Sequence, residues 1–115
     1  MAQFMLLLHD TTDDLADLSP EDMQGILARY GAWRDKVAAD GHLVGGHKLT
    51  DEGGRHVSRQ GGAVRVVDGP YSEVKEIIGG LFIIEAASYD EAVEISRSCP
   101  HLDNGWIEVR QIDQV

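Results

Sequence analysis

Apolar and polar residues follow two different rhythms over the first forty positions. Residues 3–9 centre on the apolar run FMLLL, and the polar stretch 11–14 follows them. A short apolar run bounded in this way predicts a buried strand. Beyond it, apolar side chains recur every three or four positions, which gathers them on one face of a helix: Met23, Ile26, Leu27, Tyr30, Trp33 and Val37.

The expected ends of this helix carry their own signals. Ser19 is suited to cap the first turn, and Pro20 fits the first helical position, where no backbone N–H is needed. Glu21 and Asp22 place negative charge at the positive end of the helix dipole. Gly41 is a natural terminator. The pattern therefore predicts a helix over about residues 20–40.

Short strand-like runs separated by glycine pairs make up the middle of the chain. A strand is predicted to begin at Leu43-Val44 and to bend at Gly45-Gly46. Residues 56–59 and 63–67 are predicted to form a hairpin around the turn 60–62. The dense apolar run 81–85 has the composition of a central strand.

A second helix and a final strand complete the pattern. Ser88 is placed to cap the helix, with Ala92, Val93 and Ile95 expected to face the core, and Pro100 to stop it. Residues 106–112 then alternate large apolar and polar side chains, as a half-buried strand does.

This order of elements predicts the fold class. A strand, a long helix, a group of strands, a helix and a strand make an α+β, ferredoxin-like split βαβ with an inserted hairpin. Its helices cover one face of the sheet. A homodimer that packs two sheets face to face would bury the other face.

Length, charge and cysteine content narrow the function classes. The 115 residues predict one domain, 1–115, and the formal charge of −10 argues against binding nucleic acid or an anionic membrane. A lone cysteine, Cys99, cannot form an internal disulfide, which favours a reducing compartment. The first apolar run is too short to span a membrane and no basic segment precedes it, so we expect a cytoplasmic protein.

Residues 68–80 are the best site candidate. Asp68, Gly69 and Pro70 form a turn, which explains their residue types but not the charges that follow. If the chain then stays extended, Tyr71, Glu73 and Lys75 lie on one face. Such a group could bind a small polar ligand or move a proton. The alternative is a solvated loop whose Glu-Lys pair contributes under about 1 kcal/mol.

The same segment resembles a family signature. Its pattern DGPY-x-E-x-K-E-x-x-GG is similar to that of the DGPF branch of the YCII-related proteins, with Tyr71 where that motif has Phe. The flanking elements fit that family in length and order, so the resemblance covers nearly the whole chain. It implies a dimeric α+β barrel.

The resemblance also identifies what this chain lacks. Enzyme-like YCII relatives pair a His on the first helix with an Asp before the proline that ends the second helix, and the matching positions here hold Tyr30 and Cys99. Cys99 is a poor replacement because a helix C-terminus raises the pKa of a thiol. Tyr30 is a candidate ligand contact, with core packing as the alternative.

The histidines give weaker signals. The spacing of His42, His47 and His101 matches no zinc motif, so we expect no metal and no other cofactor. His9 follows the first strand and could face a cleft beside Asp68, although a hydrogen-bonded histidine at a strand end is the favoured explanation.

Two functions from different classes remain open. The first is a dimer with a cleft lined by residues 68–76, binding a small polar molecule, with proton-transfer catalysis as a further step. The second is a non-enzymatic accessory protein with a regulatory partner. DGPF relatives often lie beside genes for alternative sigma factors, and the negative charge suits a basic partner surface.

Overall fold

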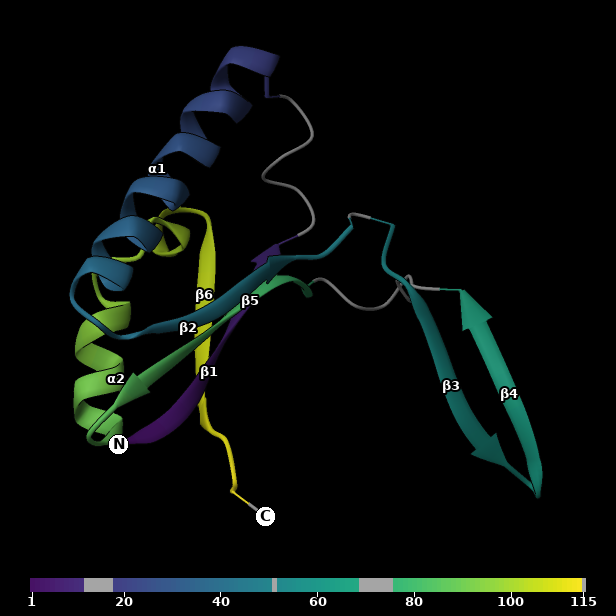
Figure 1. Ribbon diagram of the computed structural model, residues 1–115. Coiled ribbons are helices and arrows are strands. Elements are labelled where there is room, and N and C mark those ends of the chain that lie inside the picture. Colours follow the sequence, from purple (N-terminus) through teal and green to yellow (C-terminus); the bar gives the residue numbers. More distant parts are fainter. Residues whose placement is uncertain (12–17, 51, 69–75, 115) are drawn as a thin grey trace.

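The computed structural model describes residues 1–11, 18–50, 52–68 and 76–114 (Figure 1). Their elements follow the predicted order. These elements are β1 (Ala2–Thr11), α1 (Pro20–Ala39), β2 (Leu43–Lys48), β3 (Arg55–Gln60), β4 (Ala63–Asp68), β5 (Glu76–Ala86), α2 (Tyr89–Ser96), the 3-10 helix η1 (Pro100–Asp103) and β6 (Gly105–Gln111).

Four strands form the main sheet, in the order β2-β5-β1-β6, and every neighbouring pair is antiparallel. Strands β1 and β2, which α1 connects, therefore lie on either side of β5. This is the arrangement of the predicted split βαβ fold. Strands β3 and β4 pair only with each other within the described ranges. The α+β class, the ferredoxin-like order and the inserted hairpin are all confirmed.

Both helices pack on one face of this sheet (Figure 1). Alternate residues of β1, namely Phe4, Leu6 and Leu8, point to this face and are buried. Trp33 and Val37 from α1 cover them, and the Trp33 ring meets Phe82 edge to face, with 5.1 Å between centroids. The core therefore sits under the C-terminal half of α1.

The first half of α1 departs from the prediction. Leu27 belongs to the predicted core stripe, yet it is 49% exposed, because this half of the helix extends past the sheet (Figure 1). Val93 on α2 is also wrong as a core position, being 38% exposed, whereas Ala92 is fully buried.

The helix caps follow the sequence signals. The Ser19 hydroxyl accepts a hydrogen bond from the Asp22 N–H, and the Asp22 carboxylate accepts one from the Ser19 N–H, which completes a capping box. The Ser88 hydroxyl accepts from the Glu91 N–H in the same way. Both helices start where predicted because these side chains satisfy otherwise unpaired N–H groups.

Glycine allows an irregularity that positions one acid. The register of β1 against β5 shifts between Leu8 and His9, which leaves Gly79 as an extra residue on β5. A Cβ at Gly79 would collide with the Asp10 carboxylate. The bulge therefore gives the side chain of Asp10 its place on the helix side of the sheet.

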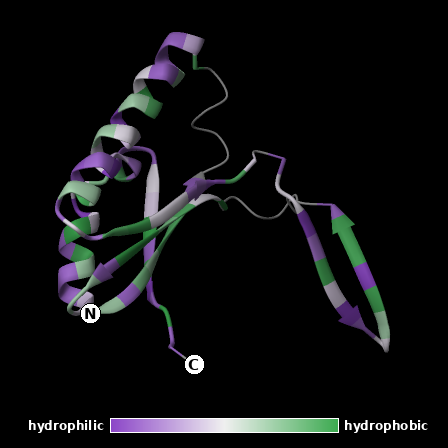
Figure 2. Cartoon of the chain, viewed as in Figure 1, coloured by the Kyte–Doolittle hydropathy of each residue, from purple (hydrophilic) through white to green (hydrophobic). Residues whose placement is uncertain are grey.

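The β3–β4 hairpin stands apart from the sheet, and apolar residues mark β4 (Figure 2). The paired residues Val57 and Val66 are 67% and 61% exposed. The radius of gyration, 16.1 Å, exceeds the roughly 13 Å of a compact chain of this length, as a projecting arm requires. Two strands alone are marginally stable in water, so this arm gains from any surface it packs against.

Candidate functional site

A cleft of about 340 Å³ opens between the first half of α1 and the sheet. We call it the Tyr30 cleft. Its volume lies within the range of small-molecule sites, and its walls are mainly apolar. Among the described residues it is lined by Leu8, Asp10, Met23, Ile26, Leu27, Tyr30, Gly31, Arg34, Gly46, His47, Lys48, Gly79, Gly80, Phe82, His101 and Asn104.

His101 is the most constrained polar group of the Tyr30 cleft. It is 3% exposed and lies on η1, which Pro100 begins after α2 has ended. Its Nδ1 is 2.7 Å from the Tyr30 hydroxyl oxygen, and its Nε2 is 2.8 Å from the backbone oxygen of His9 and 3.3 Å from Oδ1 of Asp10. Both neighbours of Nε2 are acceptors, so Nε2 carries a proton and donates.

This assignment fixes the direction of the other hydrogen bond. In a neutral imidazole with a proton on Nε2, Nδ1 is an acceptor, so the Tyr30 hydroxyl donates to it. The oxygen of Tyr30 keeps lone pairs that can accept from a ligand. Asp10, His101 and Tyr30 thus form a polar chain in the order carboxylate, imidazole, phenol.

Burial changes the pKa of the Tyr30 phenol. It raises the pKa of Tyr30 to about 12 from an ordinary 10.0, and the charges of Cys99 and Asp10 push it in the same direction. The hydroxyl therefore keeps its proton at neutral pH and can donate it.

Two packing features hold the chain of polar groups in place. A Cβ at Gly105 would collide with the backbone oxygen of His9 and would lie 2.8 Å from the Nε2 of His101, so only glycine leaves room for that hydrogen bond. One turn further along α1, the Trp33 indole donates to the Ser98 hydroxyl at 3.0 Å. That bond fixes α1 against the segment that carries His101.

The rim of the Tyr30 cleft carries positive charge from two sides. Arg34 projects from α1 one turn after Tyr30, and Lys48 lies at the end of β2. The ion pair that Arg34 makes with Asp35 is long, 3.9 Å, and both side chains are more than half exposed. A long exposed pair of this kind contributes little, which leaves the guanidinium available to other acceptors.

The described residues among those predicted from the sequence, Tyr30, Asp68 and His9, do not come together. Tyr30 lies on the wall of the Tyr30 cleft. Asp68 lies at the end of β4, where its 82% exposed carboxylate meets Nε of Arg55 at 3.0 Å. Tyr71, Glu73 and Lys75 lie outside the described residues. A ligand role for each of these residues stays a prediction.

His9 turns its ring to the opposite side of the sheet. The ring stacks on Trp106, with 3.9 Å between centroids, and its Nε2 lies 3.0 Å from Oε1 of Glu108. Hydrogen bonds from Arg110 and then from His9 lower the pKa of the Glu108 carboxyl. His9 therefore contributes only its backbone oxygen to His101.

Two members of the polar chain could not be assigned from the sequence. The sequence indicated His101 only as a potential metal ligand and did not indicate Asp10 at all. The available signal was the position of His101 two residues after Cys99, the residue that occupies one of the family's acid–base positions. Cys99 itself is 3% exposed, and burial raises the pKa of its thiol, which supports the prediction that it is a poor nucleophile. The predicted cause, a helix C-terminus, is wrong, because α2 ends at Ser96 and Cys99 directly precedes η1.

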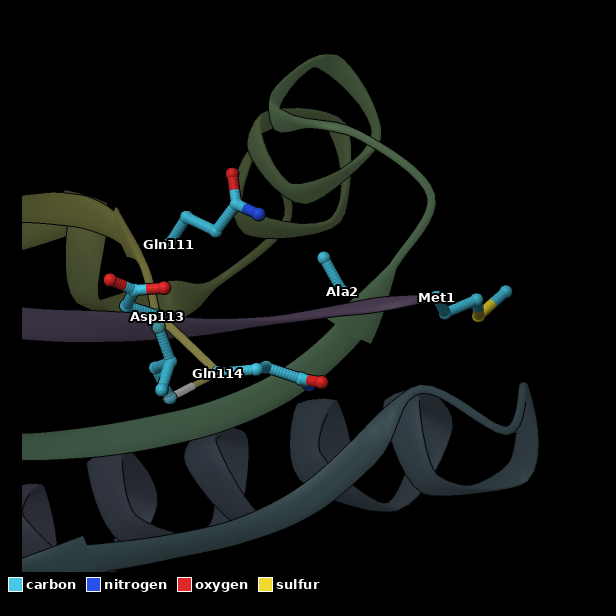
Figure 3. Close-up of a pocket in the computed structure, with 6 residues that line it drawn as sticks. Met1, Ala2, Gln111, Asp113 and Gln114 are labelled. Atoms are coloured by element: carbon cyan, nitrogen blue, oxygen red, sulfur yellow. The ribbon is translucent and has the colours of Figure 1, made fainter.

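A second hollow, of about 540 Å³, lies at the ends of the chain (Figure 3). Its walls come from Met1 and Ala2 and from residues 111–114. The labelled side chains spread apart in Figure 3 and do not converge on one point. Asp113 is the sole ionisable side chain of that described lining.

The described ranges contain no group of three His, Cys, Asp or Glu side chains arranged to hold a metal ion. Their helices include none with the length and apolar character needed to cross a membrane.

Comparison with known proteins identifies a family and a fold. Residues 2–115 match the model of the YCII-related domain. Over 53 residues the chain is 38% identical to the uncharacterized protein R00369 of Rhizobium meliloti. The matched stretch covers 44% of this chain and 43% of that protein. The match thus spans less than half of the relative's length.

A solved structure shares the fold. It is the 5-chloro-2-hydroxyhydroquinone dehydrochlorinase TftG of Burkholderia phenoliruptrix, in complex with 2,5-dihydroxybenzoquinone. The TM-score is 0.57 at 16% identity, over 98% of this chain and 95% of the other. At this identity the likeness concerns the α+β fold.

Proposed function

Because this chain belongs to the YCII-related family, we propose that it binds a small hydroxylated molecule in the Tyr30 cleft and removes a proton from it. The observation that carries the proposal is the hydrogen-bonded chain of Asp10, His101 and Tyr30 on the cleft wall. Proton transfer needs a donor and an acceptor within hydrogen-bond reach, and both are present.

Two protons move together. In the keto form of the ligand, a proton on a ring carbon passes to the oxygen of Tyr30, while the phenolic proton passes to Nδ1 of His101 over the 2.7 Å bond. The phenol is neutral before and after, and the ligand is left as an anion beside an imidazolium. The carboxylate of Asp10 stabilises that imidazolium through Nε2, as the acid of a catalytic triad does.

The size and polarity of the Tyr30 cleft support this ligand class. A single substituted ring fits within about 340 Å³ between the apolar residues of α1 and of the sheet. The structural neighbour TftG is named for action on a hydroxylated aromatic ring. For this chain, we propose a hydroxylated ring as the ligand.

A deuterium-exchange assay tests the reaction. We expect wild type to speed the exchange of ring hydrogens beside the hydroxyls of 2,5-dihydroxybenzoquinone in D₂O, followed by proton NMR. Tyr30→Phe should reduce that rate roughly 100-fold or more, the usual range for loss of an acid–base group. Tyr89→Phe is the matched control, because it also loses a hydrogen-bonded hydroxyl, the acceptor of the Gln111 N–H.

Equal rates in wild type and Tyr30→Phe would contradict the proposed reaction. An absence of both binding and exchange with a panel of hydroxylated rings would contradict the ligand class as well.

We further propose that the protein works as a cytoplasmic homodimer. The sheet face away from the helices, here called the outer sheet face, carries Met5, Leu7, Leu81 and Ile83 at paired positions of β1 and β5. Trp106 on β6 is 41% exposed. A second sheet laid on this face would remove these side chains from water, which is the main favourable term in association.

The accessory-protein alternative rests on a different segment. Exposure of residues 69–75 would favour it, and they lie outside the described residues. A sigma-factor-linked partner therefore stays a prediction from the family resemblance, with the chain's charge of −10 as its physical support.

A further inference from the structure

From the charges on the rim of the Tyr30 cleft, we infer that its ligand is an anion, a compact hydroxy acid whose carboxylate or enolate binds Arg34. The inference rests on the proposed function and specifies its substrate class. It is carried by the position of Arg34, one helical turn from Tyr30 on the same wall.

Helix geometry brings the two groups to the same ligand. Residues four apart on a helix lie on one face, so Tyr30 and Arg34 project into the cleft one above the other. Gly31 lies between them in sequence and also lines the cleft, and a Cβ added there would meet nothing within 4 Å. A flat body can therefore lie along α1 with its hydroxyl at Tyr30 and its anionic end at Arg34.

The charge balance of the cleft differs from that of the whole chain. The chain has 20 acidic and 10 basic residues. The described lining holds one acid, Asp10, and two strong bases, Arg34 and Lys48, and the Lys48 ammonium donates to the Leu49 backbone oxygen at 3.0 Å. The carboxylate of Asp10 lies 3.3 Å from Nε2 of His101.

Arg34 is suited to this role by its chemistry and its surroundings. A guanidinium offers a planar fork of donors that matches a carboxylate. Its ion pair with Asp35 is 3.9 Å long and exposed, so a ligand carboxylate can replace it at little cost. A net charge of −10 repels anions in general, so tight binding of one would have to come from local groups of this kind.

The test compares acids with their uncharged amides. The probes are 4-hydroxybenzoate and 4-hydroxybenzamide, which share a ring and a hydroxyl, and dissociation constants come from protein NMR titrations. We expect wild type to bind the acid roughly ten-fold tighter or more, the effect of a charge-assisted hydrogen bond. Added salt should weaken the binding of the acid and leave the binding of the amide unchanged.

Two variants assign the preference to Arg34. Arg34→Gln should bring the acid and the amide to within about two-fold of each other, and Arg34→Lys should keep part of the preference because it keeps the charge. Lys36→Gln is the control: it removes a cation from the same helix at a residue outside the described cleft lining, and should keep the full preference.

The outcomes separate this inference from the proposed function. If wild type binds the acid no more tightly than the amide, and Tyr30→Phe weakens the binding of both, the anion inference is wrong and the ligand site stands. A preference that survives in Arg34→Gln also overturns the inference. If neither probe shifts the resonances of the Tyr30 cleft, both the inference and the ligand class are wrong.

Discussion

The Nε2 of His101 lies 2.8 Å from the backbone oxygen of His9, and this contact decides the proton pattern of the whole site. A backbone oxygen can only accept, so the imidazole must present its proton there and a lone pair to Tyr30. The side chain of His9 stays on the outer sheet face. A strand residue thus orients the site through its backbone alone.

Gly105 protects this contact, and its replacement should be costly. A Cβ at Gly105 would collide with the His9 backbone oxygen, so Gly105→Ala should lower the free energy of unfolding by about 1–3 kcal/mol. The measurement is urea unfolding.

Gly25→Ala serves as the matched control. Gly25 lies in the interior of α1 with nothing within 4 Å of an added Cβ, so alanine there should raise the free energy of unfolding by roughly 0.5–1 kcal/mol. Equal stability of the Gly105→Ala variant and wild type would contradict the packing described around His101.

The raised pKa of Tyr30 predicts a stability loss at alkaline pH. Burial, as the main cause, lifts it to about 12 in the folded chain from 10.0. The unfolded chain therefore releases this proton first, and stability falls as the pH rises from about 10 to 12. Urea unfolding over this range should show a steeper decline for wild type than for Tyr30→Phe. Parallel curves would show that the phenol is not buried.

The outer sheet face predicts the assembly. Light scattering at micromolar concentration should give the mass of a dimer. Leu7→Glu should shift the mass toward a monomer, because it places a charge on an apolar face that the partner covers. Val93→Glu, a charge on the exposed side of α2, should remain a dimer. A monomeric wild type would rule out the face-to-face arrangement.

Local signals explain why so much of the fold was predictable. Ser19 and Ser88 cap helices, and Gly61 and Gly62 adopt positive φ in the hairpin turn. Each of these depends on residues close in sequence. Leu27 and Val93 were misplaced because the helical period gives the face of a helix but not how far the sheet reaches beneath it.

The site was harder to predict because its members are distant in the sequence. Asp10, Tyr30 and His101 come from β1, α1 and η1, and they meet only once the sheet has formed. The irregularity at Gly79 that makes room for Asp10 has no signature beyond a glycine pair. Tyr30 was identified through the family's acid–base position. His101, two residues beyond Cys99, needed the structure.

Nitrogen-15 NMR of the His101 ring tests the central claim most directly. Two-bond couplings between ring protons and ring nitrogens distinguish the two neutral tautomers, and a His101→Gln variant assigns the signals. At neutral pH the account predicts a proton on Nε2, donated to the His9 backbone oxygen and Asp10, with a bare Nδ1 that accepts from Tyr30. A proton on Nδ1 with a bare Nε2 would contradict it, because Tyr30 could not then pass its proton to the ring.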